Sequence, residues 1–82
     1  MSEHELKRLR WRCRRGMKEL DHLLLRWLER EWPAAGDERR AAFGALLECE
    51  DDRLWRCFTG KEPPPDDGPG RLIDEIRADA GL

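Results

Sequence analysis

The residues best suited to molecular recognition lie together in segment 13–21, CRRGMKELD. Arg15 has a planar guanidinium that can donate two parallel hydrogen bonds to a carboxylate. Gly16 has no Cβ, so it can adopt positive φ and let a partner approach the backbone closely. Glu19 follows three residues later, near an expected helix N-terminus, where a carboxylate interacts well with unpaired N–H groups. The same pattern is consistent with a plain junction, in which Gly16 joins two helices, Glu19 caps the second, and Arg14 and Arg15 are solvated.

No catalytic or metal-binding set accompanies this segment. His4 and His22 and the three cysteines, Cys13, Cys49 and Cys57, lack the short spacing of a ligand pair, so we expect no metal site. No Ser-His-Asp set, Gly-rich phosphate loop or suitably placed carboxylate pair is recognisable. A chain of 82 residues buries only about 60–65% of its unfolded surface, which leaves little room for a catalytic pocket. We therefore predict a partner-binding protein and not an enzyme.

The elements that position these residues are predicted to be helices, because apolar residues recur every three or four positions and no stretch alternates as a strand would. We expect an all-α fold, a single domain over residues 1–82 formed by a small bundle of about five short helices. The first helix is expected to end before Gly16, the second to run from Met17 to near Pro33, the third to span about 37–49, and the fourth to follow the acidic cluster 50–52, which supplies its N-cap, and to stop at Gly60. Beyond it we expect a Pro/Gly-rich loop, 61–70, and a loosely tied C-terminal helix, 71–82.

The four tryptophans are expected to divide between core and surface. Trp27 has helical spacing with the leucines of the second helix and is predicted to lie in the core. Trp11 lies off the apolar face of the first helix, among arginines, so it is predicted to be exposed and to serve a partner interface.

Charge and cysteine content indicate what kind of partner the protein binds and in which compartment it acts. The first fifteen residues hold six bases and two acids, although the whole chain has a net charge of −2. A basic start on an acidic protein steers it toward an acidic partner or a phosphate backbone. Three cysteines without a Cys-x-x-Cys pair favour a reducing compartment, and the start resembles no targeting signal, so we expect a cytoplasmic protein. The longest apolar run, 41–47, is far shorter than the roughly 20 residues of a membrane span, so no membrane insertion is expected.

Two segments in order, CRRGMKELD and LLECEDDRLW, resemble the SdhE family of FAD assembly factors, small helical proteins with an Arg-Gly-x-x-Glu signature. The resemblance covers roughly residues 5–60. The signature falls on Arg15, Gly16 and Glu19, which we call the signature segment (residues 15–19). Its matching surroundings are Arg14, Met17 and Asp21. The fourth helix departs from the family, which often has Pro-Asp where this chain has Asp52 and Arg53.

The resemblance implies a chaperone-like role. Such a factor binds the flavoprotein subunit of succinate dehydrogenase or fumarate reductase, here called the client, and promotes its covalent flavinylation. FAD belongs to the client, and no cofactor is expected to be held stably by the factor, which is expected to be a monomer when free. In this role Gly16 would permit close backbone approach, Arg15 would make a charge-assisted contact, and Glu19 would engage a polar or basic client group.

Two other functions remain open at this stage. One is an antitoxin-like or regulatory protein-interaction module. The other is a nucleic-acid binder that uses the Arg-rich first helix, since arginines of this kind contact phosphates. The acidic remainder of the chain and the lack of a recognised nucleic-acid module disfavour this second alternative, so we expect no nucleic-acid partner.

Overall fold

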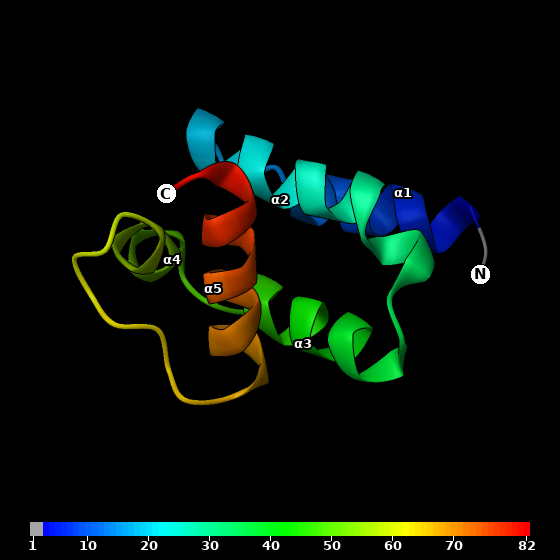
Figure 1. The fold of residues 1–82 in the computed structure, drawn as a ribbon. Coiled ribbons are helices and arrows are strands. Elements are labelled where there is room, and N and C mark those ends of the chain that lie inside the picture. Colours follow the sequence, from blue (N-terminus) through cyan, green and yellow to red (C-terminus); the bar gives the residue numbers. More distant parts are fainter. Residues whose placement is uncertain (1–2) are drawn as a thin grey trace.

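The computed structural model describes residues 3–82, and all regular elements in this part of the chain are helices, with no strand (Figure 1). The elements, in order, are α1 (Glu3–Arg12), α2 (Lys18–Arg30), the short 3-10 helix η1 (Trp32–Ala34), α3 (Asp37–Leu47), α4 (Asp51–Phe58) and α5 (Gly68–Ala80). The all-α prediction with five short helices is confirmed. No helix among these residues has both the length and the apolar character that crossing a membrane requires.

The helices pack around one core. α1 and α2 lie side by side and run in opposite directions, while α5 crosses the molecule and contacts α2, α3 and α4 (Figure 1). Every helix contributes apolar side chains, and no polar or charged residue in the described part is fully buried. The largest of the fully buried side chains are Leu20, Leu24, Leu28, Phe43, Leu46, Leu54, Phe58 and Ile73. Within α2, α3 and α4 these residues recur every three or four positions, in agreement with the apolar periodicity of the sequence.

An aromatic cluster joins α2, η1 and α3. The rings of Trp27 and Phe43 stack with centroids 4.6 Å apart, and Trp32 meets both edge-on. Trp27 also donates a hydrogen bond from Nε1 to Glu75 of α5, at 2.8 Å, so its one polar atom is satisfied where the ring is buried. The prediction that Trp27 is a core residue is confirmed.

Several helix ends differ from the sequence prediction. α2 stops at Arg30, and Trp32 belongs to a separate 3-10 turn with Pro33 in it, because proline cannot donate the hydrogen bond that would continue the helix. The N-cap of α4 is Glu50, but its side chain accepts no capping hydrogen bond, so the acidic cluster does not cap in the way we expected. Gly60 follows α4 with φ of +79°, which confirms it as the stop.

The C-terminal helix is held more firmly than the sequence suggested. α5 buries Leu72, Ile73 and Ile76 in the core, so it is not loosely tied. It also begins earlier, at Gly68, because the Asp67 carboxylate caps it by accepting a hydrogen bond from the Gly70 N–H at 2.8 Å. The irregular loop therefore ends at residue 67 rather than 70.

Candidate functional site

The link between α1 and α2 is anchored by the side chain of Arg15. Its Nε donates to Asp51 Oδ1 at 2.5 Å and its Nη1 to the Leu47 carbonyl at 2.7 Å, while Nη2 donates to the Cys49 carbonyl. Only 12% of the side chain is exposed. All three guanidinium nitrogens of Arg15 are thus engaged at the junction of α3 and α4.

This anchor follows from the chemistry of helix ends. The last carbonyls of a helix have no partner within it, and Leu47 is the last residue of α3. Asp51 begins α4, where a carboxylate is favoured by the helix dipole. A planar guanidinium suits both kinds of acceptor at once. The backbone N–H of Arg15 is held as well, by Asp21 Oδ1 of α2 at 2.7 Å. The chain around residue 15 is therefore fixed from two sides.

The neighbours of Arg15 face outward. Gly16 is exposed at φ of +85°, and a Cβ built on it would meet nothing within 4 Å. Glu19 is exposed in the first turn of α2 and makes no ion pair or side-chain hydrogen bond with any residue in 3–82. Arg14 is exposed too, whereas Met17 is half-buried against the core. The signature segment thus turns its arginine inward and presents Gly16 and Glu19 to solvent.

The sequence left two interpretations of this segment, a recognition site and a plain helix junction, and the structure agrees with each of them in part. Arg14 is solvated, as the plain-junction interpretation has it, but Arg15 is not. The positive φ that we expected Gly16 to be able to adopt is present. The contact between Arg15 and a partner stays a prediction, and such a contact would have to share a guanidinium that already bonds within the chain.

Trp11 is exposed on α1, with 73% of its surface open to solvent. Its exposure agrees with the sequence prediction, and its use at a partner interface stays a prediction. The helix that carries it is tied to the end of α3 by an ion pair between Arg12 and Glu48, at 2.6 Å. The position of Trp11 is therefore tied to the same α3–α4 junction that holds Arg15.

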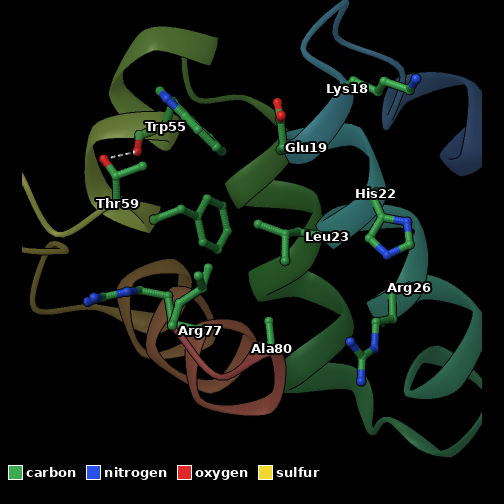
Figure 2. A pocket seen from close by; sticks show the side chains of 11 residues that line it. Lys18, Glu19, His22, Leu23, Arg26, Trp55, Thr59, Arg77 and Ala80 are labelled. Carbon is green, nitrogen blue, oxygen red and sulfur yellow. Dashed lines mark hydrogen bonds between the residues drawn. The ribbon is translucent and has the colours of Figure 1, made fainter.

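A groove of 790 Å³ opens beside Glu19, between α2, α4 and α5 (Figure 2). We call it the α2–α4–α5 groove. Its lining consists of Lys18, Glu19, His22, Leu23, Arg26, Trp55, Phe58, Thr59, Arg77, Ala80 and Leu82. Sequence reasoning missed it, since its walls come from helices far apart in the chain. The only local signals in the sequence were an aromatic residue, Trp55, in the fourth helix and an acid, Glu19, near the start of the second.

The fourth helix departs from the family pattern at Arg53, and the structure gives this residue a partner within the chain. Arg53 pairs with Glu62 at 3.2 Å, and Arg56 pairs with the same carboxylate at 3.1 Å. The hydrogen bond from Arg56, followed by that from Arg53, lowers the pKa of Glu62. Arg53 thus helps to hold the loop after α4.

The buried cysteines are poor nucleophiles. Burial raises the pKa of Cys13 to about 12, and burial together with the nearby Glu62 raises that of Cys57, so both are thiols at neutral pH. No group of three or more His, Cys, Asp or Glu residues within 3–82 is placed to hold a metal ion. The signature segment and the α2–α4–α5 groove therefore provide a shaped surface for binding.

Comparison with known proteins identifies the family to which the chain belongs. The family model described as "Flavinator of succinate dehydrogenase" matches residues 7–80. The chain belongs to this family. The resemblance noted in the two sequence segments is thereby confirmed, and it extends through α5.

Relatives of similar length support the assignment. A protein of Xylella fastidiosa (strain 9a5c) named FAD assembly factor SdhE is 50% identical over 74 residues, which cover 90% of this chain and 76% of that protein. Proteins with the same name from Methylococcus capsulatus and Shewanella oneidensis are 42% and 40% identical. They match 90% and 92% of this chain and 89% and 92% of their own lengths. No solved structure gives a significant match.

Proposed function

We propose that this chain is an FAD assembly factor that binds the flavoprotein subunit of succinate dehydrogenase or fumarate reductase and promotes its covalent flavinylation. Membership of the flavinator family and the shared name of its relatives support this proposal. The observation that carries it is the geometry of the signature segment. Arg15 is anchored inside the molecule, while Gly16 and Glu19 are left exposed and without partners within the described chain.

The proposed role is non-enzymatic. The client contributes FAD and the side chain that bonds to it, and the flavin supplies the chemistry of that bond. The factor needs only to hold the client in an arrangement that brings the reacting groups together, an effect worth several kcal/mol in well-oriented systems. The raised pKa values of the buried Cys13 and Cys57, and the lack of a metal-ligand cluster in the described residues, are compatible with such a role.

Two residues of the signature segment would make the decisive contacts. Gly16 presents bare backbone with open space around it, so a client surface can approach without meeting a side chain. Glu19 lies in the first turn of α2 and its carboxylate has no partner within residues 3–82, so it can accept hydrogen bonds from a polar or basic client group. Arg15 and Asp21 would keep the two in place.

The test is co-expression of the client flavoprotein with factor variants, followed by measurement of protein-bound flavin fluorescence after denaturation. Gly16→Arg and Glu19→Ala are expected to lower covalent flavin severalfold. The matched control is Glu29→Ala, an exposed glutamate elsewhere on α2, which should leave covalent flavin at the wild-type level. Undiminished flavin with both signature variants would refute the assignment of this segment to client binding.

The factor is also proposed to act in the cytoplasm and to be a monomer when free. The nucleic-acid alternative, which relies on the arginines of α1, can be tested by measuring binding to DNA or RNA at different salt concentrations. Retention on DNA or RNA that falls steeply with salt, without any effect on client flavin, would favour that alternative over the assembly-factor role.

A further inference from the structure

The α2–α4–α5 groove has an apolar interior. Leu23 and Phe58 are buried core residues that reach its floor, and Trp55 of α4 is half-buried at its wall. Figure 2 shows Leu23 and Trp55 directed into the space between the helices, with Ala80 of α5 on the opposite side. A volume of 790 Å³ lies in the range of sites that bind a compact ligand or a few side chains of a partner. Apolar surface of this shape is stabilised when a partner covers it.

The rim of the groove is mainly basic. Lys18, Arg26 and Arg77 are cations, and Glu19 is the one carboxylate among the lining side chains. Arg26 is partly neutralised by Asp79, at 3.7 Å. Lys18 and Arg77 have no ion pair with any residue in 3–82, and the enclosed Nε of Arg77 has no hydrogen-bond acceptor among these residues.

His22 also lines the groove. The chain as a whole carries a net charge of −2, so a basic rim around an apolar floor is a local feature. Its charge complements an acidic partner.

We propose that the groove binds an acidic segment of the client flavoprotein that inserts a large apolar side chain between Trp55 and Ala80. This inference rests on the proposed function and specifies which client surface the factor takes. Glu19 connects the two regions, because it is the exposed acid of the signature segment and also part of the groove wall. A client that contacts Gly16 and Glu19 is therefore already at the edge of the groove.

Three variants test the groove by different means. Trp55→Ala removes an aromatic wall of the kind that dominates binding energy at protein interfaces. Ala80→Trp fills the groove from the last residue of α5 without removing a contact. Lys18→Glu reverses a rim charge in the first turn of α2, where an acid is favourable to the helix. The matched control is Arg71→Glu, the same change of charge at an exposed residue near the start of α5 and outside the groove.

The measurements are the dissociation constant for the purified apo flavoprotein subunit, the salt dependence of binding, and covalent flavin formed on that subunit. Trp55→Ala and Ala80→Trp are expected to weaken binding about tenfold or more. Lys18→Glu is expected to weaken it severalfold and to reduce its salt dependence, while Arg71→Glu changes it less than about twofold. Thermal unfolding of each variant verifies that Ala80→Trp and Lys18→Glu remain folded.

The outcomes separate this inference from the proposed function. If wild type drives flavinylation and all three groove variants bind the client as tightly as wild type, the groove inference is overturned and the assembly role stands. If wild type neither binds the client nor raises covalent flavin, the proposed function fails and the groove inference fails with it. If Trp55→Ala instead abolishes a dimer of the factor while client affinity is unchanged, the occupant is a second copy and the proposal is again overturned.

Discussion

Replacing Arg15 by alanine should destabilise the factor itself, whatever happens at the client. The substitution removes one hydrogen bond to the Asp51 carboxylate and two to the carbonyls of Leu47 and Cys49. Because Asp51 is 38% exposed, water can replace part of the lost ion pair, and we count that bond at about 1 kcal/mol. The two bonds to carbonyls contribute about 0.5–1.5 kcal/mol each. The expected loss is about 2–4 kcal/mol of unfolding free energy.

Urea unfolding followed by circular dichroism measures this loss directly. For a domain of this size, about 2–4 kcal/mol corresponds to a fall in melting temperature of roughly 10–30 °C. Arg15→Lys keeps the charge but cannot donate in three directions from a planar fork, so it should lose about 1–2 kcal/mol. Arg14→Ala removes the exposed neighbour and should stay within about 0.5 kcal/mol of wild type. Equal stability of Arg15→Ala and Arg14→Ala would refute the anchoring role.

Other predictions concern packing and pH. Gly70→Ala places a Cβ 1.6 Å from the Pro65 carbonyl oxygen, which forces backbone to move and should cost about 2–3 kcal/mol. Gly44→Ala, in the interior of α3 with open space around it, should instead stabilise by about 0.5–1 kcal/mol, and urea unfolding of the pair checks both signs. The pKa of Cys13 is raised from 9.0 to about 12, so between these values the unfolded chain loses a proton that the folded chain keeps. Unfolding free energy should therefore fall as pH rises above 9, and less steeply in Cys13→Ala; equal slopes in the two proteins would contradict this reasoning.

The sequence was sufficient to predict the helices, because their apolar periodicity is a local property. It located the breaks at Gly16 and Gly60 for the same reason, since glycine at a helix end needs no distant partner. It underestimated α5, whose stability depends on Leu72, Ile73 and Ile76 meeting other helices. Periodicity identifies an apolar face but does not say how completely that face will be covered.

The site was predictable only in part. The segment containing Arg15, Gly16 and Glu19 stands out in the sequence, but the direction of each side chain does not. Two of the three acceptors of Arg15 are backbone carbonyls, which no sequence pattern reveals. The third, Asp51, is 36 positions away and is one of several acids in its neighbourhood. The α2–α4–α5 groove depends even more on tertiary packing.

The residues of the signature segment have different physical roles. Arg15 uses its polar atoms inside the molecule, and this anchoring fixes the link in which Gly16 keeps a positive φ. Glu19 has no partner in the described chain, so its contribution to stability is limited to the helix-dipole interaction, about 0.3–1 kcal/mol. Removing its carboxylate therefore changes recognition with little effect on folding, whereas removing the guanidinium of Arg15 changes folding first. A loss of flavinylation in an Arg15 variant thus identifies a client contact only after the amount of folded factor has been matched to wild type.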